Sequence, residues 1–172
     1  MTPPPLPIGN LPLPRWACVP GEADQAVADY ETLAQVTALV PSRFSGYVPA
    51  RHPALRYALR LNDHGYFWES QEILETVWAA APQGGRERIL LRACIQIATA
   101  NLRLRMQKPN AAARLLGEAL GELKALGMRN VAGDGFADGF PVAALGDLIQ
   151  AKLARPQLAK ADWVAFGAVS RT

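Results

Sequence analysis

The sequence has few of the residues that build metal and redox sites. Its 172 residues include only two cysteines and two histidines. Cys18 and Cys94 stand far apart, whereas a metal or redox role usually needs close pairing such as C-x-x-C. We therefore expect two reduced thiols, with Cys94 as a small core residue of an apolar helix. Both histidines, His52 and His64, are expected in loops, and the sequence predicts no bound cofactor.

Long apolar runs are also missing. In the apolar middle of the chain the longest uncharged run covers residues 93–102 and ends at Arg92 and Arg103. A membrane-spanning helix needs about 20 residues. The N-terminus lacks a basic region followed by a continuous apolar one, so no signal peptide is evident. These absences predict a cytoplasmic protein that does not interact with a membrane.

Charge is sparse and mixed in sign. Charged residues make up 19% of the chain, and the net charge is +3; globular proteins average about 25% charged residues. Nucleic-acid binders gather their basic residues on one face. Here helix periodicity places Arg103 and Arg105 about 200° apart. We therefore expect a solvated basic rim and no nucleic-acid partner.

The sequence also lacks alternating strand patterns and any repeat at a fixed period, which argues against a solenoid. Its length suits one domain. We expect an all-α fold, a single helical bundle of four to six helices over residues 22–172. Seven prolines stand in the first 20 residues. Because proline fixes φ and lacks a backbone donor, residues 1–21 are predicted to form an extended arm.

Apolar periodicity predicts where the helices lie. The longest should be central, because it is apolar on most sides. Asn110 is a plausible N-cap for the helix that follows it, and Gly127 a plausible end. The predicted helices are Glu22 to Leu39, Ala54 to Asn62, Tyr66 to Ala80, Arg86 to Gln107, Ala111 to Leu126 and Val142 to Leu153.

Three glutamates distinguish the helix from Tyr66 to Ala80. At 100° per residue, Glu69 falls on the side that faces water, and Glu72 and Glu75 fall at its boundary. An amide, Gln71, falls inside the apolar stripe. The other members of that stripe are Phe67, Leu74 and Trp78.

The stretch NDHGYFWESQEILETVW, residues 62–78, resembles the signature of the domain-of-unknown-function family 309, a small all-helical bacterial and archaeal family. The similarity extends over about residues 47–150, and Arg88 to Gln96 resembles the family's next motif. The residues of the first stretch that match the family pattern are Asn62, Gly65, Tyr66, Phe67, Glu69, Glu72, Leu74, Glu75 and Trp78, with Trp68 as an extra residue.

The resemblance implies a loose grouping with predicted metal-dependent hydrolases, because the family's histidine-glutamate helix is suited to a metal. In this chain Gln71 replaces the family histidine, and Arg103 replaces a second one. An amide is a poor ligand for zinc or iron, and a guanidinium stays protonated and cannot ligate. A hydrolase-like site on Glu72, Glu75 and His64 is the alternative that remains.

A second interpretation starts from the polar residues on otherwise apolar stripes, which are costly to bury without hydrogen bonds. Glu72 and Glu75 are expected to pair with Arg92 or Arg103 in a buried polar seam. Such a seam fixes helix register in a non-catalytic protein that binds a partner or self-associates. Alternatively, Arg92 and Arg103 bind a small anion. The candidate site residues are Glu69, Gln71, Glu72, Glu75, Arg88, Arg92, Gln96 and Arg103.

Overall fold

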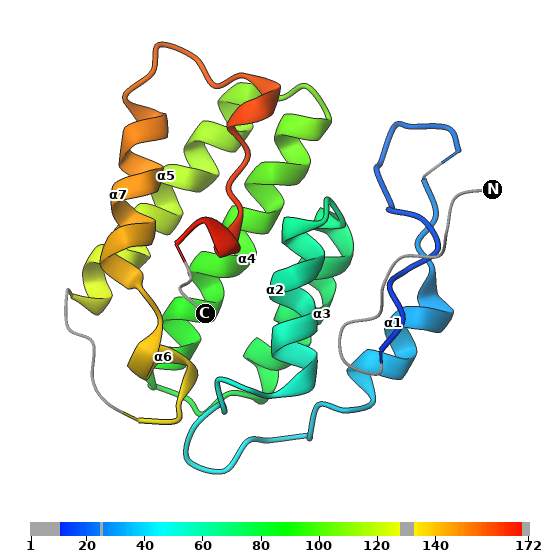
Figure 1. Cartoon of the computed structure of the whole chain (residues 1–172), viewed down its shortest axis with the longest axis vertical. Helices are drawn as coiled ribbons and strands as arrows, with labels where there is room; N and C mark the ends of the chain where they lie inside the picture. The colour runs from blue at the N-terminus through cyan, green and yellow to red at the C-terminus, as the bar shows by residue number, and fades with distance from the viewer. Residues whose placement is uncertain (1–10, 25, 128–132, 170–172) are drawn as a thin grey trace.

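The computed structural model describes residues 11–24, 26–127 and 133–169. Within them the structure has helices and no strand, and Pro49 and Gly135 form an isolated antiparallel bridge. The all-α prediction is confirmed (Figure 1). The α-helices are α1 (Tyr30–Thr37), α2 (Pro53–Asp63), α3 (Phe67–Ala80), α4 (Arg86–Arg105), α5 (Pro109–Leu126), α6 (Phe136–Gly139) and α7 (Val142–Leu153).

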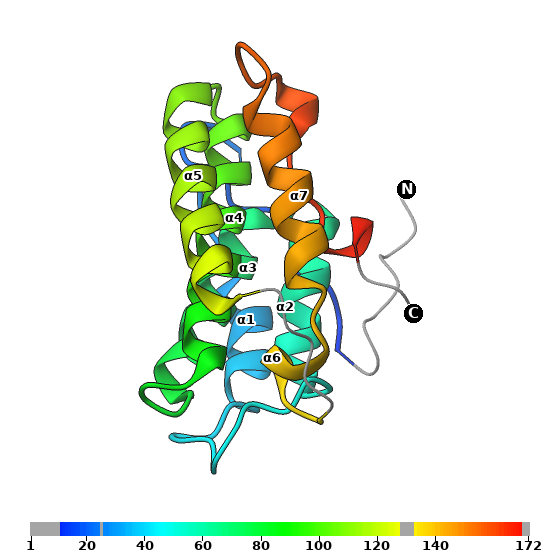
Figure 2. The same cartoon turned by 90° about the vertical axis from the view of Figure 1, so that its left-hand side faces the viewer.

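Helix α4 is the centre of the molecule, as its composition predicted. It packs against α3 on one side and α5 on the other, while α2 packs on α3 and α7 on α5 (Figures 1 and 2). Leu90, Leu91 and Ile97 of α4 are fully buried. No helix in the described part of the chain is long and apolar enough to cross a membrane.

Helix α1 is shorter than predicted, since it begins at Tyr30 and not at Glu22. Asp29 is its N-cap and accepts hydrogen bonds from the backbone N–H and the hydroxyl of Thr32, at 3.4 and 2.7 Å. This cap starts the helix at Tyr30. Val27 and Tyr30, which lie inside the predicted helix, are 66% and 64% exposed. The apolar periodicity predicted too long a helix, because periodicity does not show where a carboxylate caps the first turn.

The N-terminal segment, residues 11–24, contains no helix. Its Leu13 and Val19 are buried against the bundle. The Tyr57 hydroxyl of α2 donates a hydrogen bond to the Pro12 carbonyl at 2.6 Å. The first ten residues, with four of the seven prolines, lie outside the described residues, and the arm boundary at residue 21 stays a prediction.

The remaining helix ends follow local chemistry. Helix α5 begins at Pro109 with Lys108 as the N-cap, two residues before the predicted start. Proline suits the first helical position, where its missing N–H costs nothing. Gly127 ends α5 as predicted, with a φ of +77° that glycine adopts readily. Helix α6 is a single turn that the predicted helices did not include.

Two buried asparagines tie α2, α4 and the C-terminal segment together. Asn101 of α4 donates from Nδ2 to Asn62 Oδ1 at 2.7 Å and to the Val164 carbonyl at 2.8 Å. Its Oδ1 accepts from the Val164 N–H at 2.8 Å. Asn62 Nδ2 also donates to the Val164 carbonyl, at 2.9 Å. The segment after α7 is therefore held by side chains of α2 and α4.

We expect Asn101→Ala to lower the free energy of unfolding by about 2–4 kcal/mol, because it leaves the buried Val164 and Asn62 groups without their partner. Urea denaturation measures the loss. Asn110→Ala, at an exposed position of α5, is the control and should change the value by less than about 0.5 kcal/mol. An equally small loss in Asn101→Ala would contradict the anchoring role.

Candidate functional site

The predicted seam between α3 and α4 does not form as expected. Arg92 is exposed, and its Nη1 lies 3.6 Å from Glu122 Oε1 on α5, not beside Glu72 or Glu75. Arg103 Nη1 donates to Sδ of Met106, the C-cap residue of α4, at 3.5 Å. The predicted pairing was wrong: Arg92 meets α3 at the Trp78 ring, whose centre lies 5.8 Å from the guanidinium, and has its carboxylate partner on α5.

Arg88 has a local structural contact instead. Its guanidinium lies 4.3 Å from the centre of the Trp78 ring and donates to the carbonyls of Ala79 and Ala81 at 3.4 and 3.3 Å. It therefore satisfies carbonyls at the C-terminal end of α3. Gln96 Oε1, in contrast, is buried without a hydrogen-bond partner among the described residues.

Gln71 is not part of the buried stripe of α3. It is half-buried, and its Nε2 donates to Glu75 Oε1 at 3.3 Å. Phe67 and Leu74 of the predicted stripe are buried, but the rest of the buried side is formed by Ser70, Ile73 and Val77 and not by Gln71 and Trp78. The amide that replaces the family histidine therefore lies on the outer side of α3.

Glu72, Glu75 and His64 do not form a metal site. Glu72 and Glu75 line a groove with the loop from Val40 to Ser42, whereas His64 lines a different cavity. No three His, Cys, Asp or Glu side chains of the described residues gather in a group suited to a metal ion. Burial raises the pKa of Glu72, and the neighbouring Glu75 carboxylate raises it further. The set of Glu72, Glu75 and His64 is not brought together.

Glu69 was predicted on the wet side of α3, and this is wrong. Its side chain is fully buried, and Oε2 accepts a hydrogen bond from the Cys18 N–H at 2.6 Å. The N-terminal segment covers this side of α3, which the periodicity of α3 cannot reveal. Burial raises the pKa of Glu69 to about 7, with smaller contributions from the Asp29 and Glu72 carboxylates, while the Cys18 N–H opposes the rise. Glu69 Oε1 has no hydrogen-bond partner in residues 11–24, 26–127 and 133–169.

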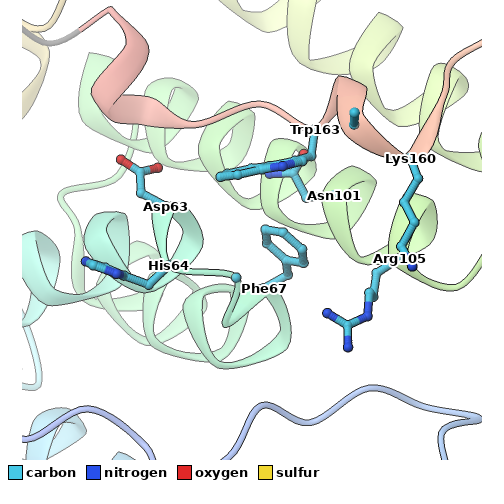
Figure 3. Close-up of a pocket in the computed structure, with 9 residues that line it drawn as sticks. Asp63, His64, Phe67, Asn101, Arg105, Lys160 and Trp163 are labelled. Carbon is cyan, nitrogen blue, oxygen red and sulfur yellow. The ribbon is translucent and has the colours of Figure 1, made fainter. Parts of the chain in front are cut away.

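A cavity of about 510 Å³ opens where α2 ends, beside the C-terminal end of α4. Figure 3 shows it between the chain that follows α2 and the segment that follows α7. We call it the Phe67–Trp163 cavity. Its lining residues are Asp63, His64, Gly65, Phe67, Asn101, Arg105, Lys160, Ala161 and Trp163.

Two aromatic rings form the apolar part of this cavity. The centres of Phe67 and Trp163 lie 5.6 Å apart, with the ring planes tilted by 56°. Phe67 is buried in a small apolar cluster with Val19 and Leu102. Trp163 precedes Val164, whose N–H and carbonyl are both bonded to Asn101. Both rings are therefore held in place by the surrounding fold.

The polar groups divide between the two ends of the cavity. Asp63 lies at one end and accepts hydrogen bonds from the N–H groups of Phe166 and Gly167, at 2.7 Å each. Arg105 and Lys160 lie at the other end (Figure 3). The cavity thus combines an aromatic surface with a cationic end.

The sequence matches a family model described as "Domain of unknown function (DUF309)" over residues 55–115. The predicted resemblance to this family is confirmed over these residues. No curated protein matches the sequence, and no solved structure matches it.

The matched stretch supplies only part of the cavity. It contains Phe67, Asn101 and Arg105, whereas Lys160 and Trp163 follow it in the chain. Sequence reasoning missed this site because the C-terminal segment has no helical periodicity to place its side chains. One available signal was Asn62, an amide on the inward stripe of α2 whose partner is the asparagine beside the cavity.

Glu69→Gln tests the buried acid. The folded state holds the Glu69 proton more tightly than the unfolded chain does, so the free energy of unfolding falls as pH rises from about 4.5 to about 7 and is then constant. We expect the neutral variant to lack this fall and to gain about 2–3 kcal/mol relative to the native protein between pH 4.5 and pH 8.

Urea denaturation at pH 4.5, 6 and 8 measures the difference. Glu118→Gln, which neutralises an exposed carboxylate of α5, is the control and should show no such trend. A constant difference between Glu69→Gln and the native protein across the three pH values would contradict the raised pKa.

Proposed function

We propose that this chain is a non-catalytic binding protein whose ligand is a planar aromatic molecule with an anionic group. The observation that carries the proposal is the pair of fixed rings, Phe67 and Trp163, beside the cations Arg105 and Lys160. The cavity volume of about 510 Å³ falls within the ~300–1,000 Å³ range of small-molecule sites.

Both parts of the ligand follow from the chemistry of the lining. Aromatic side chains favour offset or edge-to-face contact with another ring. The guanidinium of Arg105 offers a planar fork of donors to a carboxylate or phosphate, and Lys160 adds a flexible point charge. Asp63 and Asn101 already make hydrogen bonds within the protein, which supports a binding role over a catalytic one.

The anionic group was predicted to bind at Arg92 and Arg103, whereas in this proposal it binds at Arg105 and Lys160. Arg92 lies beside Glu122 of α5, whereas Arg105 and Lys160 line one cavity. Binding of a protein partner or self-association stays a prediction, as does the cytoplasmic location.

Calorimetry with a pair of probes tests the ligand class. The first probe is 2-naphthoate, a planar ring system with a carboxylate. The second is 2-naphthylmethylamine, a similar ring system with a positive charge at neutral pH. We expect 2-naphthoate to bind and the amine to bind at least about 10-fold more weakly, because like charges repel at the cationic end. Equal binding of the two probes, or no binding of 2-naphthoate, would refute the proposed function.

Trp163→Ala tests the place of binding. Removing the indole deletes one of the two rings and should weaken 2-naphthoate binding by about 10-fold or more. Trp16→Ala removes a tryptophan that is 37% exposed on the N-terminal segment and should leave the affinity unchanged. An unchanged affinity in Trp163→Ala would place the binding site elsewhere.

A further inference from the structure

The N-terminal segment reaches the proposed ligand site at one residue. Glu22 Oε1 accepts from Arg105 Nε at 3.0 Å, and Glu22 Oε2 accepts from Arg105 Nη2 at 3.3 Å. This bidentate pairing uses the same fork of donors that would bind the anionic group of a ligand. In Figure 3 the side chain of Arg105 extends toward the N-terminal segment.

The residues before Glu22 pack on the wall of the same cavity. Val19 is 2% exposed and contacts the cluster that contains Phe67 and Leu102, with Trp163 at its edge. The Glu22 N–H donates to the Val19 carbonyl at 3.1 Å. The Cys18 N–H donates to the buried Glu69. We call residues 18–22 the strap; it is attached at Cys18, Val19 and Glu22.

The attachment at Glu22 is the weakest of the three. The side chains of Arg105 and Glu22 are 35% and 39% exposed, and ion pairs that are open to water contribute little to stability. Cys18 and Val19, in contrast, are nearly fully buried. A second anion that reaches Arg105 therefore replaces Glu22 at little cost.

From this geometry we infer that Glu22 is a built-in competitor of the ligand, and this inference rests on the proposed function. The Glu22 carboxylate and the anionic group of the ligand exclude each other at Arg105. Ligand binding then detaches the strap at Glu22 and loosens it over Phe67, and a closed strap lowers the affinity for the ligand. The N-terminal segment thereby regulates the cavity, because whatever holds the strap down weakens ligand binding.

Two matched variants test the competition. Glu22→Gln removes the competing charge and should tighten 2-naphthoate binding by about 3- to 5-fold, the range expected for an exposed ion pair. Glu31→Gln makes the same change of charge in the N-terminal region, at a carboxylate 3.6 Å from Arg15. It should leave the affinity within about 1.5-fold of the native value.

A thiol-labelling measurement separates strap release from a simple charge effect. Cys18 lies in the strap, whereas Cys94 is fully buried in α4. Labelling with N-ethylmaleimide at pH 8, with each site quantified by mass spectrometry, should be faster at Cys18 in Glu22→Gln without ligand. It should also be faster at Cys18 in the native protein with saturating 2-naphthoate. Cys94 should be unchanged in both cases.

The outcomes distinguish this inference from the proposed function. Equal affinity in the native protein and Glu22→Gln, with binding still weakened by Trp163→Ala, overturns the competition and leaves the proposed function standing. Tighter binding in Glu22→Gln without a change at Cys18 shows a charge effect only and overturns strap release. Failure of 2-naphthoate to bind both the native protein and Glu22→Gln overturns the proposed function and this inference together.

Discussion

The side chain of Asn101 is the point on which the arrangement of the cavity depends. It lies in the middle of an apolar stretch of α4, where a polar group is costly unless all of its hydrogen bonds are made. Its amide bonds to Asn62 of α2 and to both backbone groups of Val164. Because Val164 follows Trp163 directly, this one network sets the position of the indole relative to Phe67. A buried polar contact thus determines the geometry of an aromatic surface.

The N-terminal segment covers the side of α3 that carries Glu69. It shields Glu69 from water and supplies the N–H that bonds to the Glu69 carboxylate. Its next residues fill space beside Phe67 and place Glu22 on Arg105. The same short non-helical stretch therefore bonds to Glu69 of α3 and to Arg105 of α4. This stretch links the interior of the helical domain to the opening of the cavity.

Helices α2, α3, α4 and α7 were predictable and the site was not, for one physical reason. The amphipathic pattern of α2, α3, α4 and α7 arises within each helix, so periodicity located those helices to within about two residues. Glu69, by contrast, is buried by chain that lies about 50 residues away, and Trp163 reaches the cavity from a segment without regular period. Local pattern also failed at Arg92, whose charged partner is on α5 and not on α3. Sequence pattern describes each helix alone, whereas the cavity forms where α2, α3 and α4 meet the segment that follows α7.

Asp29 has a consequence for how the molecule opens. It caps α1 through Thr32 and also accepts hydrogen bonds from the backbone N–H, Nε and Nη2 of Arg15. The Arg15 guanidinium holds the pKa of this carboxyl well below its usual range. The Asp29 carboxylate therefore joins the start of α1 to the chain that precedes it. The chain around Arg15 and helix α1 should therefore open together as one cooperative unit, separate from α4.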